Sequence, residues 1–117
     1  MNAANVLAGV AVTDLDTAQP WYEKLLGSAG NRPMPEVAEW SFPQGGGLQV
    51  FADQQRAGAS SITLVVDDLD QQVGRLQSDG HKVHSRTDSE YVKTAQVEDP
   101  AGNRIVLAQA KTHHLVR

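Results

Sequence analysis

Two stretches of the chain spell nearly the same junction between a strand and a helix. VTDLDTAQPWYEKLLG begins at Val12 and VDDLDQQVGRLQSDG begins at Val66, so the two Asp-Leu-Asp triplets stand 54 positions apart. In each copy, β-prone apolar residues precede the triplet and a helical stripe of apolar residues follows it. This repeat indicates one supersecondary unit present twice, because a single unit has an apolar sheet face that it cannot cover alone.

The first copy predicts a strand, a helix and three further strands over residues 5–53. Asp16 is the predicted N-cap of the helix, since its carboxylate can accept the free amide hydrogens of a first turn. Gly27 is predicted to end the helix in the left-handed conformation. Two prolines restrict NRPMPEVAEW to a loop or an edge strand, and the glycines of PQGGG predict a hairpin between VAEWSF and LQVFAD.

The second copy repeats this order over residues 60–110. SSITLVVDD is a predicted strand, Asp70 is the predicted N-cap, and Gly80 is predicted to close the second helix. Three strand candidates follow, HKVHSR, YVKTAQVED and NRIVLAQA, and DPAGN is a strong turn signal between the last two. The expected fold class is therefore α+β, with two βαβββ modules in one domain, 1–117, and a polar C-terminal tail, 111–117.

Composition and charge remove several classes of function. A net charge of -4 with scattered basic residues gives no basic stripe for nucleic acid and makes anionic membranes poor partners. No apolar run approaches the ~20 residues of a membrane span, and the N-terminus lacks a basic leader region, so we expect a cytoplasmic protein. With no cysteine, disulfides, thiolate metal sites and a cysteine nucleophile are excluded, and a metal would need histidine or carboxylate ligands.

VAVTDLDTAQPWYEKLLG together with VEDPAGNRIVLAQ resembles the vicinal oxygen chelate superfamily, which includes glyoxalases, extradiol dioxygenases and bleomycin-resistance proteins. The resemblance extends from residue 5 to about residue 110. It implies the glyoxalase/bleomycin-resistance fold, in which paired βαβββ modules form a curved mixed sheet around a small-molecule cavity. It also implies a homodimer.

The same resemblance implies where a metal ion would be bound, on one residue from the first strand and one from the last strand of each module. Those positions are Leu7, Gln49, Ser61 and Val106. Divalent transition metals need several imidazole or carboxylate donors, and Gln49 offers only a neutral carbonyl. We therefore expect no metal and no other cofactor in the cavity, which disfavours glyoxalase and dioxygenase activity.

Strand alternation predicts which side chains line the cavity. Alternate residues along a strand point to opposite faces of the sheet. One of the two sets is uniformly apolar and suits the face under the helices, whereas the other mixes small residues with a few polar groups, as ligand pockets do. The candidate ligand-binding residues are Trp40, Gln49, Phe51, Ser61, Thr63, Gln96 and Arg104. In VAEWSF the parity alone does not choose between Trp40 and Glu39. Trp40 is preferred because a flat ring with one polar tip suits a planar ligand, and an ordinary core residue is the alternative.

The histidines do not define a metal or catalytic site. His81 and His84 stand three apart in a strand candidate, so their side chains are expected on opposite faces. His113 and His114 are expected to be solvated in the C-terminal tail. No catalytic residue is assigned, although His84 or Glu39 could move a proton in a metal-independent reaction.

Three functions remain compatible with the sequence. The favoured one is a metal-free binding protein that holds an apolar or aromatic small molecule, since it requires none of the missing ligands. The second is a metal-independent isomerase or lyase of the same superfamily. The third is a dimeric structural or regulatory module with a collapsed cavity.

Overall fold

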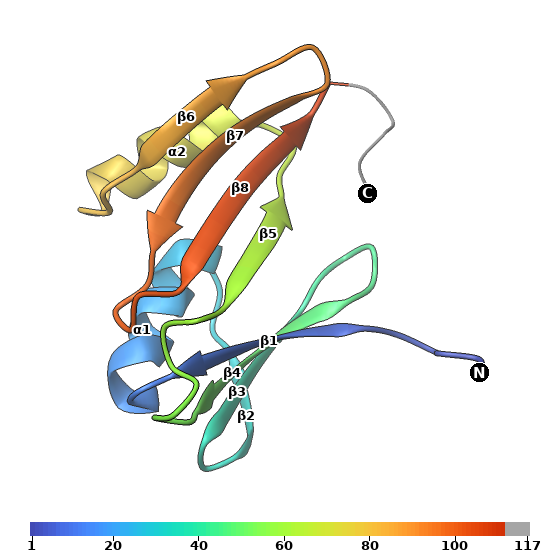
Figure 1. The fold of residues 1–117 in the computed structure, drawn as a ribbon, viewed down its shortest axis with the longest axis vertical. Coiled ribbons are helices and arrows are strands. Elements are labelled where there is room, and N and C mark those ends of the chain that lie inside the picture. The colour runs from blue at the N-terminus through green and yellow to red at the C-terminus, as the bar shows by residue number, and fades with distance from the viewer. Residues whose placement is uncertain (112–117) are drawn as a thin grey trace. The chain divides into compact units, whose positions relative to one another are not determined.

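The computed structural model describes residues 1–111, which fold as two compact units. Unit 1 consists of residues 1–60 together with 99–103, and unit 2 consists of residues 61–98 together with those from Arg104 onward. Each unit has one helix and one four-stranded sheet (Figure 1). His113 and His114 lie outside the described residues, so their predicted solvation stays a prediction.

The ten elements confirm the duplicated βαβββ order. Those of unit 1 are β1 (Leu7–Val12), α1 (Leu15–Leu26), β2 (Asn31–Met34), β3 (Val37–Ser41) and β4 (Gly47–Ala52). Those of unit 2 are β5 (Ser61–Val65), α2 (Leu69–Ser78), β6 (His84–Asp88), β7 (Val92–Glu98) and β8 (Arg104–Ala110). Within residues 1–111, no helix is both long and apolar enough to span a membrane.

The two sheets have equivalent topology. The strand orders are β1-β4-β3-β2 and β5-β8-β7-β6, and in each sheet the first strand of the unit runs parallel to the last. The other neighbours are antiparallel, as the predicted hairpins require. Each sheet is therefore mixed, and the expected α+β class is confirmed.

Each helix covers one face of its own sheet and encloses a small apolar core. In unit 1, α1 packs on β4 and β3 through Tyr22 and Leu25, opposite the fully buried Leu48 and Val50. In unit 2, α2 packs on β7 and β8, and its core residues are Leu69, Val73, Leu76, Ala95, Val97, Ile105 and Leu107. Ile105 and Leu107 are among the apolar residues predicted for the face under the helices, so that prediction is confirmed for β8.

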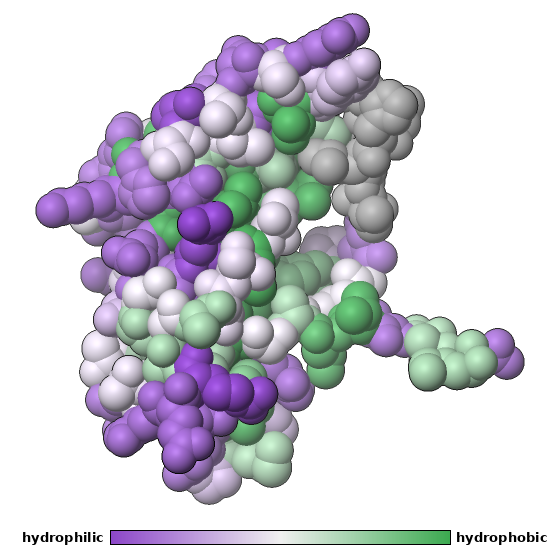
Figure 2. Space-filling view, viewed as in Figure 1, coloured by the Kyte–Doolittle hydropathy of each residue, from purple (hydrophilic) through white to green (hydrophobic). Residues whose placement is uncertain are grey.

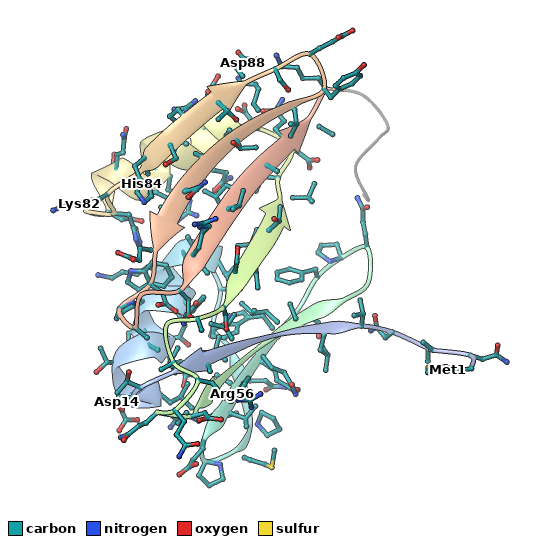
Figure 3. All side chains as sticks on the ribbon, viewed as in Figure 1. Met1, Asp14, Arg56, Lys82, His84 and Asp88 are labelled. Atoms are coloured by element: carbon teal, nitrogen blue, oxygen red, sulfur yellow. The ribbon has the colours of Figure 1, made fainter. Side chains whose placement is uncertain are left out.

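The helices begin two residues earlier than predicted, so Asp16 and Asp70 are not the N-caps. Asp14 Oδ1 accepts the Asp16 backbone N–H at 3.0 Å, and Asp68 Oδ1 accepts that of Gln71 at 3.1 Å. Both caps have extended backbones, which let the carboxylate reach the first turn. Figure 3 shows Asp14 at the junction of β1 and α1.

The second aspartate of each triplet instead forms an ion pair at the helix surface. Asp16 Oδ1 lies 3.2 Å from Arg32 Nη2, and Asp70 Oδ1 lies 2.8 Å from Arg86 Nη2. The two arginines, Arg32 and Arg86, are also 54 residues apart, so the duplication extends to this ion pair.

The predicted helix ends are correct for α1 and one residue late for α2. Gly27 is the left-handed C-cap of α1, with φ 71°. In α2 the C-cap is Asp79, and Gly80 follows it with φ 90°. The left-handed turn that ends the helix is therefore present in both units.

Residues 99–103, which form the turn between β7 and β8, belong to unit 1. A buried hydrogen-bond network holds this turn. The Tyr22 hydroxyl donates to Asp99 Oδ2 at 2.7 Å, and Asn103 Nδ2 donates to the same oxygen at 2.8 Å. Asn103 Nδ2 also donates to the Ala11 carbonyl oxygen at 2.7 Å. Asp99 and Asn103 are 4% and 0% exposed, and these bonds satisfy polar groups that would otherwise be costly to bury.

Candidate functional site

The sheet face of unit 1 that points away from α1 brings together two predicted ligand-binding residues. Gln49 on β4 pairs with Gly9 on β1 and with Glu39 on β3, and Phe51 pairs with Ala11 on β1. Side chains at paired positions lie on the same face of a sheet. Gln49 and Phe51 are therefore neighbours on this face, and both are half-buried.

A polar pair stands at the centre of this face. Gln49 Nε2 donates to Glu39 Oε2 at 2.8 Å, and both residues are half-buried. A carboxylate accepts hydrogen bonds only, so the amide must turn its nitrogen toward Glu39 and its oxygen away. Among residues 1–111, Glu39 forms no ion pair. The pair thus offers a ligand two acceptor oxygens, Gln49 Oε1 and Glu39 Oε1.

Phe51 provides a flat apolar surface beside this pair. A Cβ atom at Gly9 would lie 3.3 Å from Phe51 Cε1, so the glycine leaves the ring room to lie close to β1. The Arg56 guanidinium lies over the ring, 5.2 Å from its centroid. Arg56 stands in the segment after β4, as Figure 3 shows.

Arg56 has its own counter-ion. Its Nε donates to Asp53 Oδ2 at 2.8 Å, and this hydrogen bond lowers the pKa of the Asp53 carboxyl below its ordinary value. The arginine is therefore held by Asp53 while its guanidinium remains over Phe51.

The corresponding face of unit 2 brings together the other predicted residues. Ser61 pairs with Arg104, Thr63 pairs with Val106, and Val106 pairs in turn with Gln96. The four candidates therefore share the face that points away from α2. In Figure 2, polar residues in purple gather over the β6 edge of unit 2, whereas white and green residues lie over β8 and β5.

Trp40 does not share a face with Gln49 and Phe51, so the preferred orientation of VAEWSF is wrong. Trp40 pairs with the fully buried Leu48 and is itself 5% exposed, with its ring centroid 6.1 Å from that of Tyr22. Its Nε1–H donates to the Ser28 carbonyl oxygen at 3.1 Å. The tryptophan fills the core under α1. Glu39, the alternative to Trp40, shares the face opposite α1 with Gln49.

His84 begins β6 and lies in register with Gln96. Its Nδ1 is 2.9 Å from Ser85 Oγ, and Ser85 has a positive φ of 54° in the irregular part of the strand. His81 precedes the strand, so the prediction that both histidines belong to one strand is wrong. The structure places no acid in hydrogen-bond contact with His84 among the described residues.

The residues at the implied metal positions do not fit a divalent metal ion. Leu7 shares a face with Gln49, and Ser61 shares one with Val106. Two of these side chains are hydrocarbon, and the other two supply one neutral amide and one hydroxyl, which are weak ligands for zinc or iron. Within residues 1–111, no three histidine, aspartate or glutamate side chains converge as a metal site would require.

Two units of βαβββ topology, each with a helix on one sheet face and mixed residues on the other, define the class of glyoxalase-fold proteins. The sequence profile of the Glyoxalase/Bleomycin resistance protein/Dioxygenase superfamily matches residues 4–107. The chain belongs to this superfamily, which confirms the resemblance found in its sequence.

Solved structures share the whole fold. A glyoxalase/bleomycin resistance protein from Catenulispora acidiphila is 29% identical with a TM-score of 0.83, over 92% of this chain and 98% of that one. TnmS3, an antibiotic binding protein from Streptomyces, is 24% identical with a TM-score of 0.82, over 95% and 99%. A lactoylglutathione lyase from Agrobacterium tumefaciens is 17% identical with a TM-score of 0.80, over 97% and 98%. No curated protein sequence matches the chain.

Sequence reasoning left one residue of the unit 1 face, Glu39, as an alternative and missed another, Arg56. Glu39 was the alternative to Trp40, and the signal that selects it is its pairing with Gln49, which alternation within a single strand does not reveal. Arg56 lies outside every strand, and only the position of its guanidinium over Phe51 identifies it.

Proposed function

We propose that this chain is a metal-free small-molecule binding protein that holds an apolar or aromatic compound on the unit 1 face opposite α1. The observation that supports this most directly is the half-buried Phe51 ring beside the Gln49–Glu39 pair. A flat ring supplies dispersion and apolar contact, and a few fixed polar groups orient the ligand.

The fold by itself does not select this function, because it is shared by a protein named for antibiotic binding and by one named as a lyase. The side chains at the implied metal positions favour binding over metal-dependent catalysis. Leu7 and Val106 supply no metal ligand, and the remaining polar groups on both faces suit recognition through hydrogen bonds.

A stability screen tests the proposal. Planar aromatic compounds are added in the presence of EDTA, and a ligand that binds the folded state raises the melting temperature by mass action. We expect Phe51→Ala to weaken the binding of any hit roughly tenfold or more, because the ring is part of the contact. Phe42→Ala is the matched control, since Phe42 lies in the β3–β4 turn. Failure of every compound, or equal binding by the Phe51 variant, would contradict the proposal.

We propose further that the chain forms a homodimer through its edge strands. Val6 is 73% exposed, and Leu7 on β1 and Val65 on β5 are 49% and 44% exposed. Exposed apolar residues on edge strands favour pairing with another chain. Sedimentation velocity should give about twice the 12.6 kDa of one chain. Leu7→Lys should reduce association, and Gln77→Lys, at an exposed position of α2 away from every strand edge, should not. A monomer at all concentrations would exclude the dimer.

A further inference from the structure

We propose that the compound held on the unit 1 face is a planar organic cation, such as a protonated aromatic amine or amidine, whose charged N–H groups bind Glu39. This inference rests on the proposed function and specifies the class of ligand. Three separate observations support it: the hydrogen-bonding groups of the face, the environment of Phe51 and the distribution of charge between the units.

The hydrogen-bonding groups of the unit 1 face favour a ligand that donates hydrogen bonds. Gln49 Nε2 is already bonded to Glu39 Oε2 at 2.8 Å, so the amide oxygen and the second carboxylate oxygen are what the pair presents to a ligand. A ligand that presents only acceptors would leave these oxygens unpaired on binding, which is costly where water is excluded. A ligand N–H gains a charge-assisted hydrogen bond instead.

Phe51 accommodates a cationic plane. The Arg56 guanidinium lies 5.2 Å from its centroid, within the range in which a ring quadrupole attracts a cation. Arg56 would repel a second cation, but Asp53 already balances its charge at 2.8 Å. Glu39 has no such partner among residues 1–111, so its negative charge is the uncompensated one on this face.

The net negative charge of the chain lies in unit 1. Its seven carboxylates are those of Asp14, Asp16, Glu23, Glu36, Glu39, Asp53 and Asp99. Its three basic residues are Lys24, Arg32 and Arg56, which gives a formal charge of -4. The remaining seven carboxylates and seven basic residues of the sequence belong to unit 2, which is balanced. The field around unit 1 therefore attracts cations within about one Debye length, roughly 10 Å at 0.1 M salt.

Three ligands that share the acridine ring but differ in charge test the inference. 9-Aminoacridine is a cation at pH 7.5, acridine is neutral, and acridine-9-carboxylate is an anion. Binding is measured by fluorescence titration on the full chain at low and high salt. We expect the cation to bind at least tenfold more tightly than acridine and the anion to bind most weakly.

Two isosteric variants separate contact from the general field. Glu39→Gln should reduce the preference for the cation to less than about threefold. Glu36→Gln removes the same charge from the exposed β2–β3 turn of the same unit and should leave the preference nearly unchanged. Melting curves of both variants establish that they fold.

The outcomes distinguish the inference from the proposed function. Equal binding of cation and neutral ring, or equal effects of the two variants, would overturn the inference and leave metal-free binding intact. If none of the three ligands binds, the inference is overturned. If the planar compounds of the stability screen fail as well, the proposed function falls with it.

Discussion

At the scale of single residues, the Tyr22–Asp99–Asn103 network is a buried polar cluster whose hydrogen bonds are satisfied within unit 1. Asp99 is buried, and it forms no ion pair within residues 1–111. Its hydrogen-bond donors there include the backbone N–H groups of Ala101 and Asn103, at 2.9 and 2.8 Å. Burial and the hydrogen bond with Asp99 raise the pKa of Tyr22 well above its ordinary value. The hydroxyl is therefore protonated at neutral pH and donates to Asp99.

Removing that hydroxyl tests the network. Tyr22→Phe keeps the ring in the core but leaves the buried Asp99 short of one donor, so we expect a loss of about 1–3 kcal/mol in the free energy of unfolding. Urea denaturation measures the change. Tyr91→Phe is the control, because it removes a hydroxyl from a tyrosine that is 53% exposed, and we expect a much smaller effect. Equal losses in the two variants would contradict the role assigned to the network.

At the scale of elements, the sequence predicted the order of helices and strands well but not the choice between neighbouring candidates. Helical periodicity, the glycine-rich turn and the duplication all favour one topology, and each was confirmed. The sequence predicts the N-cap of α1 two residues late because Asp14 and Asp16 are the same residue type. Capping depends on the extended backbone of Asp14, φ -145°. Residue identity alone does not report that conformation.

The corrected caps lead to a prediction for both helices. Asp14→Ala and Asp68→Ala should each lower the free energy of unfolding by about 1 kcal/mol, since each removes an acceptor from the first turn. Asp16→Ala and Asp70→Ala should cost less, because they remove only exposed ion pairs. Thermal unfolding of the four variants measures the difference. A larger loss from the second aspartate of each triplet would show that the cap assignment is mistaken.

The orientation of Trp40 shows why alternation alone is incomplete. Period-2 patterning separates two faces but does not say which one a helix covers, and that depends on packing between distant residues. A Cβ atom at Gly30 would approach Trp40 Cζ2 within 2.7 Å, so the absence of a side chain there makes room for the indole in the core. This contact joins β3 to the segment after α1 and has no local sequence signal.

At the scale of the whole molecule, the sequence predicted the family and the mixed faces of both sheets, whereas the specific chemistry of the unit 1 face required coordinates. Gln49 and Phe51 followed from strand parity, and the sequence itself shows that the four implied metal positions carry neither histidine nor a carboxylate. Glu39 and Arg56 required the pairing of β3 with β4 and the path of the segment after β4. Family membership defines the scaffold, and under the proposed function these side chains select the ligand.

Chemical-shift mapping of bound ligand tests the central claim most directly. A ¹⁵N-labelled chain is titrated, in EDTA, with a planar compound that stabilises it. We predict that the perturbed resonances gather on Gly9, the Gln49 side-chain amide and Phe51, while the Trp40 indole N–H, bonded to Ser28 in the core, stays unchanged. Perturbations centred on Trp40, or binding that appears only after a divalent metal ion is added, would contradict a metal-free site on the face opposite α1.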